Sequence, residues 1–168
     1  MNQNIEQKLE QKFQEIDQEI KTDENSQPIP LENLMNKKFP DTEWIVEQLI
    51  PSGARVAISG APAAFKTWLI LDLMLKVSKG GILFDKFVTN QTGVLLIDEE
   101  NGERLLQKRF QKLNKTFDLP IHLLSFSEFK LSKHSVDKLI SFAKDKNIKL
   151  IVFDSLVRIH ASDENDAT

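Results

Sequence analysis

Apolar runs and amphipathic runs alternate along the chain from residue 54 onward. Almost wholly apolar runs predict four buried strands, at residues 54–59, 94–98, 121–125 and 150–154. Apolar positions spaced three and four apart predict three helices between them, at residues 66–79, 103–115 and 135–145. Apolar strands alternating with amphipathic helices are typical of a parallel sheet covered on both faces, so we expect a three-layer α/β fold. Ligands bind such sheets at the carboxyl ends of the strands, which directs attention to the loops after Ser59, Asp98 and Asp154.

The first 26 residues show a separate pattern. Apolar residues at helical spacing predict an amphipathic helix over residues 1–21, at Ile5, Leu9, Phe13, Ile16 and Ile20. Seven acidic residues and three lysines give residues 1–26 a net charge of −4, whereas the whole chain carries −3. A solvated helix and a short coiled-coil or partner-docking helix both fit this pattern. We expect residues 27–53 to be a lead-in segment and residues 54–168 to form the core.

Composition excludes several classes of protein. The 168 residues contain no cysteine, which rules out a disulfide scaffold, a zinc–thiolate site and a cysteine nucleophile. No apolar run approaches the roughly 18 residues that a membrane span needs, so we expect no membrane partner. The absence of cysteine also fits a cytoplasmic protein. A net charge of −3 gives no overall basic field that would indicate nucleic-acid binding.

The loop between the first predicted strand and helix resembles a phosphate-binding loop. It reads Gly60-Ala61-Pro62-Ala63-Ala64-Phe65-Lys66-Thr67 and is followed by Trp68. The pattern G-x-x-x-x-G-K-[ST] is matched at Gly60, Lys66 and Thr67, where backbone amides and a helix N-terminus suit polyphosphate. Lys66 would reach the terminal phosphates of ATP, and Thr67 would bind Mg²⁺. Phe65 stands where glycine is usual, and a plain strand–turn–helix with a solvated lysine is the alternative.

Acidic residues follow two of the other predicted strands. Asp154 ends the apolar run Leu150–Phe153, the Walker B pattern, and is placed to hold Mg²⁺ through a water molecule. The run Asp98-Glu99-Glu100 follows the strand at 94–98, and we expect Glu100 to activate the attacking water. Alternation places the side chains of Asp98 and Glu100 on one side and that of Glu99 on the other. Caps of the following helices are the alternative role for both acidic sites.

The order and spacing of these motifs resemble the RecA-like P-loop ATPases of the RepA hexameric-helicase group, often described only as AAA family ATPases. The matching text is Glu43–Glu47, Pro51–Gly53, the phosphate loop, Thr67–Asp72, Ser78–Gly81, Gly93–Glu100 with Arg104 and Arg109, and Leu150–Arg158 ending in Asp163-Glu164-Asn165. The resemblance implies that the protein binds ATP and Mg²⁺ and hydrolyses ATP with Glu100 as the water-activating residue. It also implies homo-oligomeric rings with sites between subunits and, in some relatives, single-stranded DNA and replication of plasmids, phages or mobile elements.

The RecA arrangement also predicts a gap in the sheet. There, the phosphate-loop strand and the Walker B strand are separated by a strand that comes from later sequence. This chain has 14 residues after Asp154, so we expect an incomplete core, truncated after Walker B. Three functions are therefore compatible with the sequence. They are a helicase-type motor, an ATP-dependent regulatory or loading switch, and a non-catalytic remnant that binds a protein partner.

Two further groups of residues have both a structural and a functional interpretation. Phe126 and Phe129 follow the third predicted strand, where core packing competes with a platform for base stacking. A basic helical face carries Lys108, Arg109, Lys112 and Lys115, and such faces are usually solvated.

Overall fold

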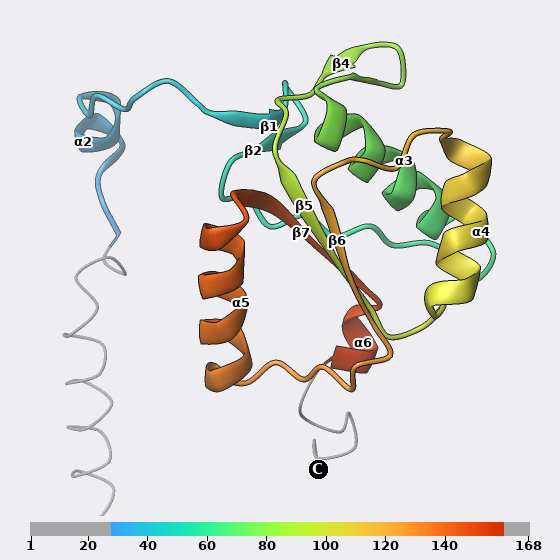
Figure 1. Cartoon of the computed structure of the whole chain (residues 1–168). Coiled ribbons are helices and arrows are strands. Elements are labelled where there is room, and N and C mark those ends of the chain that lie inside the picture. The colour runs from blue at the N-terminus through green and yellow to red at the C-terminus, as the bar shows by residue number, and fades with distance from the viewer. Residues whose placement is uncertain (1–27, 160–168) are drawn as a thin grey trace, which may run out of the picture. The chain divides into compact units, whose positions relative to one another are not determined.

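The computed structural model describes residues 28–159, and the chain divides into a part up to Asp41 and a part from Thr42 (Figure 1). The described residues of the first part contain one short helix, α2 (Leu31–Met35), which has no buried residue. The helix expected over residues 1–21 lies outside the described residues. No helix within residues 28–159 has the length and apolar character needed to cross a bilayer.

The second part is built on a parallel sheet of three strands. These are β5 (Gly93–Asp98), β6 (Ile121–Ser125) and β7 (Ile148–Asp154), in the order β6-β5-β7. Asp98 is in register with Ser125 on one side and with Asp154 on the other. The carboxyl ends of the three strands therefore meet at one edge, as the sequence pattern predicted.

Helices cover both faces of this sheet (Figure 1). One layer contains α3 (Lys66–Lys79) and α4 (Glu103–Leu113), and the other contains α5 (Lys133–Asp145) and the short α6 (Leu156–Ile159). All six residues of β5 are buried, and alternate residues face opposite layers. Val94 and Leu96 pack in one core cluster, whereas Leu95 and Ile97 pack in the other. This alternation makes the fold a three-layer α/β structure.

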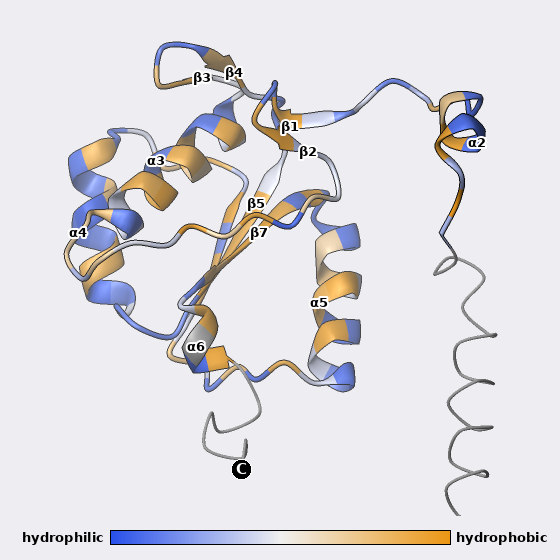
Figure 2. Cartoon of the chain, turned by 180° about the vertical axis from the view of Figure 1, so that it is seen from behind, coloured by the Kyte–Doolittle hydropathy of each residue, from blue (hydrophilic) through white to orange (hydrophobic). Residues whose placement is uncertain are grey.

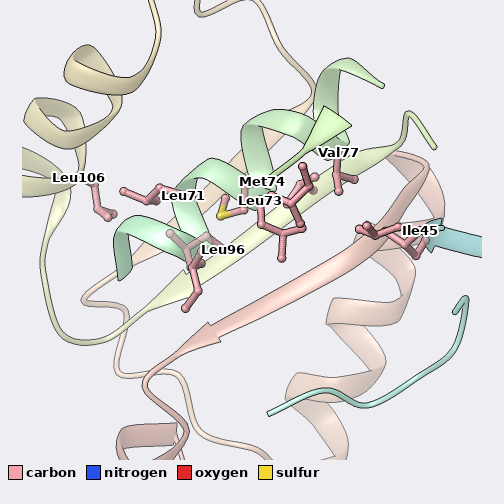
Figure 3. Close-up of a cluster of buried hydrophobic side chains, with 11 residues drawn as sticks. Ile45, Leu71, Leu73, Met74, Val77, Leu96 and Leu106 are labelled. Atoms are coloured by element: carbon pink, nitrogen blue, oxygen red, sulfur yellow. The ribbon is translucent and has the colours of Figure 1, made fainter. Parts of the chain in front are cut away.

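The larger core cluster lies between α3, α4 and β5. Figure 3 shows Leu71, Leu73, Met74 and Val77 of α3 lying beside Leu96 of β5, with Leu106 of α4 next to them. Figure 2, coloured by hydropathy, shows hydrophobic positions along β5 and β7 and both hydrophobic and hydrophilic positions on α4. The helix that follows the phosphate loop is therefore fixed to the sheet through its apolar face.

Two short hairpins extend this core. β1 (Trp44–Val46) pairs antiparallel with β2 (Ile50–Pro51), and β3 (Ile82–Leu83) pairs antiparallel with β4 (Phe87–Val88). An isolated bridge between Val46 and Thr89 links the two hairpins. Ile45 and Val46 are buried and belong to the larger core cluster. The lead-in segment thus contributes side chains to the hydrophobic core.

Most predicted elements of the core are confirmed, with small shifts at their ends. The helix at 66–79 and the strand at 121–125 have the predicted bounds. α5 begins at Lys133, two residues earlier than predicted, because Ser132 caps it in a reciprocal arrangement with Ser135. β7 begins two residues earlier than predicted, at Ile148.

The predicted buried strand at residues 54–59 is wrong. These residues form no strand, all are exposed, and Val56 and Ile58 are 57% and 41% exposed. The physical reason is the strand order: among the described residues β7 pairs only with β5, so nothing lies beside residues 54–59 to complete a ladder. An apolar run without a paired neighbour does not become a buried strand.

Candidate nucleotide-binding site

The loop from Gly60 to Thr67 folds around the amine of its own lysine. Lys66 Nζ donates hydrogen bonds of 2.9 Å to the carbonyl oxygens of Gly60 and Ala61. The amide of Ala64 donates to the same Ala61 carbonyl at 3.2 Å. Pro62 and Ala63 lie between these contacts, at the tip of the loop. The loop thus places a cation within its own curve, at the N-terminus of α3, where polyphosphate binds in proteins of this architecture.

Phe65 occupies the glycine position of the motif and adopts the backbone conformation that glycine would supply. Its φ is 59° and its ψ is 19°, in the left-handed region, and it directly precedes α3. Its side chain is 74% exposed, so the ring does not fill the loop. The penalty for a phenylalanine here is therefore conformational, about 1–2 kcal/mol, rather than steric.

Two motifs far apart in sequence meet beside the loop. Thr67 Oγ1 donates a 3.0 Å hydrogen bond to Asp154 Oδ2, across 87 positions of sequence. α3 supplies Thr67 in its first turn, and β7 supplies Asp154 at its carboxyl end. A hydroxyl and a carboxylate in contact fit Mg²⁺, which takes few protein ligands and completes its shell with phosphate oxygens and water.

Asp154 is half-buried and lies near two other acidic side chains. Burial raises the pKa of Asp154 above its ordinary value, and the hydrogen bond from Thr67 opposes this. The negative charges of Asp98 and Glu100 raise the pKa further, whereas the positive charge of Arg109 lowers it. A raised pKa means that the carboxylate is held in a place where negative charge is unfavourable. A divalent cation would relieve this repulsion.

An asparagine that belongs to none of the predicted motifs links the acidic groups. Asn101 Nδ2 donates to Asp98 Oδ2 at 3.0 Å and to Asp154 Oδ2 at 3.3 Å. Its Oδ1 accepts a 2.8 Å hydrogen bond from Arg109 Nη1. Asp98 is fully buried, and its Oδ1 accepts from the amides of Glu100 and Asn101. One signal in the sequence pointed to Asn101, its position three residues after Asp98 at the end of a buried strand. An aspartate there favours a turn in which its carboxylate accepts hydrogen bonds from the amides that follow.

Glu99 and Glu100 have different surroundings. Glu99 is only 8% exposed, and its carboxylate accepts four hydrogen bonds from the loop after β6, given by the Ser127 hydroxyl and the amides of Ser127, Glu128 and Phe129. Burial alone would raise the pKa of Glu99, but these hydrogen bonds together lower it below its ordinary value. Glu100 is exposed, and no donor among residues 28–159 bonds to its carboxylate. Only Glu100 of the two is therefore available to a ligand.

An aromatic and cationic group flanks the site. Trp68, the second residue after Lys66, lies under the guanidinium of Arg109, 5.7 Å from the ring centroid, and under the amine of Lys112, 6.0 Å away. Arg109 thus contacts both Trp68 and the asparagine that joins the acidic groups. Part of the basic face of α4 is consequently directed to the site rather than to open solvent.

The site contains no preformed multidentate metal centre. Within the part of the chain that the structure describes, no cluster of three or more histidine, cysteine, aspartate or glutamate side chains is arranged to hold a metal ion. One hydroxyl and one carboxylate are what a magnesium site completed by nucleotide phosphates requires.

Comparison with known proteins agrees with this arrangement. The chain matches the AAA domain family over residues 10–168, which is most of its length, and it belongs to this family of P-loop ATPases. No curated protein and no solved structure shows a significant match. The family and the observed three-layer fold together define a nucleotide-binding α/β domain.

Proposed function

We propose that the protein binds ATP with Mg²⁺ at the loop Gly60–Thr67. The observation that carries the proposal is the 3.0 Å contact between Thr67 and Asp154, which joins the phosphate-loop hydroxyl to the Walker B carboxylate. Lys66 would exchange its two loop carbonyls for the terminal phosphates, and the first amides of α3 would bind the phosphates beside it. Mg²⁺ would neutralise the developing charge of the transferred phosphoryl group.

We further propose that Glu100 orients and activates the water that attacks the terminal phosphate. Two observations support this role: Glu100 is exposed, and its negative charge is one of those that raise the pKa of Asp154. Glu99 is unsuited to this role because its carboxylate is already saturated with hydrogen bonds. The alternation of side chains after β5 supports the same choice.

The finer proposal is a RepA-type ATPase that acts as a homo-oligomeric ring on single-stranded DNA during replication. The strand order supports the RecA arrangement, because β7 has an unpaired edge within the described residues and residues 54–59 have no neighbouring strand. A strand supplied from outside residues 28–159 would fill this place and convert residues 54–59 into a sheet strand. An ATP-dependent regulatory switch without unwinding is the alternative, with ATP turnover that does not respond to DNA.

Two variants separate nucleotide binding from hydrolysis. Lys66→Ala removes the phosphate-binding cation, so ATP binding measured by calorimetry should be lost. Glu100→Gln keeps the loop intact, so ATP should still bind while phosphate release falls by about 100-fold or more, as for loss of a general base. Lys138→Ala, an exposed lysine of α5, is the matched control and should behave like the parent. If folded Lys66→Ala protein bound ATP as tightly as the parent, the proposed site would be wrong.

A further inference from the structure

A second hollow lies next to the nucleotide site, at the carboxyl end of β6 and the start of α4. It has a volume of about 540 Å³, and the residues that bear on its chemistry are Asn101, Gly102, Arg104, Lys108, Ser125 and Phe126. Asn101 belongs also to the network that bonds to Asp98 and Asp154. The two sites therefore share one residue, although their other lining residues differ.

The loop that carries Phe126 has an unfavourable backbone conformation and several hydrogen bonds to the end of β5. Phe126 and Glu128 have positive φ angles of 45° and 55°, which side chains other than glycine rarely adopt. The amide of Phe126 donates to the Asp98 carbonyl at 3.0 Å, and the buried Glu99 carboxylate accepts from the next three amides. Strained backbone fixed by several buried contacts is characteristic of ligand-binding segments.

The side chain presented by this loop is an exposed aromatic ring. Phe126 is 60% exposed, and its ring lies against Gly102, where a Cβ atom would be only 2.5 Å from it. Phe129 behaves differently, because it packs with the smaller core cluster and its ring lies 6.2 Å from that of Phe153. Core packing thus explains Phe129 but leaves most of the Phe126 side chain exposed.

Charge and an unused hydroxyl complete the hollow. Arg104 and Lys108 lie one turn apart on α4, and within residues 28–159 neither forms an ion pair. Glu103 also lines the hollow, so the local excess is one positive charge. Ser125 also lines the hollow, and its Oγ is a buried atom with no hydrogen-bond partner among the described residues. A ligand with a planar ring and an anionic group would match the exposed ring of Phe126 and the two cations.

We propose that this hollow binds one nucleotide of single-stranded DNA. The base stacks on Phe126, and the phosphate lies between Arg104 and Lys108. Stacking on an aromatic side chain beside cations is how proteins hold single strands without reading sequence. The inference deepens the proposed function, since Asn101 and the segment from Asp98 to Gly102 join the DNA pocket to the carboxylates of the ATP site.

The test is binding of a fluorescein-labelled oligothymidylate, measured by fluorescence anisotropy without nucleotide and at low salt. Phe126→Ala should weaken binding by about tenfold or more, and Phe126→Trp should restore it, because each stacked base contributes about 1–3 kcal/mol. Arg104→Ala combined with Lys108→Ala should weaken binding and reduce the salt dependence, with a change in slope of about 0.7 for each phosphate that is no longer neutralised.

Matched controls lie outside the hollow. Phe117→Ala removes another exposed phenylalanine, 59% exposed, and Lys138→Ala removes an exposed helical lysine; both should bind like the parent. Circular dichroism of each variant establishes whether it is folded. If Phe126→Ala does not fold, the oligonucleotide affinity of Phe126→Trp still tests whether a stacking ring is needed at this position.

The outcomes separate this inference from the ATP proposal. Lys66→Ala should still bind the oligonucleotide when nucleotide is absent, even though it binds no ATP. The DNA pocket is overturned if the parent does not bind, if the Phe126 and Arg104/Lys108 variants bind as the parent does, or if polyglutamate displaces the oligonucleotide at equal charge concentration. A parent that binds DNA through Phe126 but never binds ATP would overturn the proposed function and leave the pocket established.

Discussion

Phe65 shows how a single residue can depart from a motif and keep its geometry. The glycine of the phosphate loop is needed for its backbone, and Phe65 reproduces that backbone at φ 59° with its ring turned to solvent. The sequence alone identified the mismatch but could not decide whether the ring would crowd the loop. That decision depends on the direction of the side chain, which only the folded loop sets.

We expect Phe65→Gly to bind ATP at least as tightly as the parent, because glycine adopts the left-handed region without penalty. Phe65→Val should weaken binding and lower stability by about 1 kcal/mol or more, since a β-branched residue is strained there. Calorimetric titration with ATP and urea unfolding measure the two effects. Weaker binding by Phe65→Gly would show that the ring itself contacts the nucleotide.

Glu99 gives a prediction about pH. Its hydrogen bonds lower its pKa in the folded protein below the ordinary 4.5, so the charged form stabilises the fold. This contribution is present above pH 4.5 and is lost as the pH falls through the lowered pKa. Glu99→Gln should therefore reduce the free energy of unfolding by about 1–3 kcal/mol near neutral pH, and by less in acid.

Urea unfolding of the parent and Glu99→Gln across this pH range provides the measurement. Glu128→Gln is the control, because the Glu128 side chain is exposed and only its amide takes part in the cluster. A parent–variant difference that did not change with pH would contradict a role for the charged carboxylate.

At the scale of elements, hydrophobic periodicity predicted the helices and the parallel strands well. β5 is an apolar run because both of its faces are covered, and α3 was recognised from its wide apolar face. The β1–β2 and β3–β4 hairpins were not predicted because strands of two or three residues carry no measurable period.

Residues 54–59 show where the same reasoning fails. Their composition predicts a buried strand, but strand formation depends on a neighbour that the composition does not report. The RecA-like strand order predicts a gap in the sheet beside this segment, and that gap stays a prediction.

The exposure of this segment can be tested by substitution. Val56→Ser and Ile58→Thr should each change the free energy of unfolding by less than about 0.5 kcal/mol, because both side chains are largely exposed. Leu96→Ala, in the fully buried centre of β5, should cost about 2–5 kcal/mol. Changes at Val56 and Ile58 close to that of Leu96→Ala, measured by urea unfolding, would show that the segment is buried in a sheet after all.

At the scale of the whole molecule, the site is assembled by topology. The Gly60–Thr67 loop, the end of β5 and the end of β7 are distant in sequence, and the parallel register brings Asp98 beside Asp154 while α3 brings Thr67 to them. The sequence predicted which loops would meet, because strand ends in a parallel sheet share an edge. It did not predict Asn101 as the link between them, since that role depends on distances between side chains rather than on a motif.

We propose that this assembled edge of the sheet binds ATP together with Mg²⁺. The most direct test is a calorimetric titration of the folded parent protein with ATP, with Mg²⁺ present and with Mg²⁺ removed by a chelator. We expect saturable binding of one ATP per chain that is tighter with Mg²⁺, because Thr67 and Asp154 would reach the nucleotide through the metal. Absence of saturable binding by folded protein, or an affinity unchanged by Mg²⁺, would contradict it.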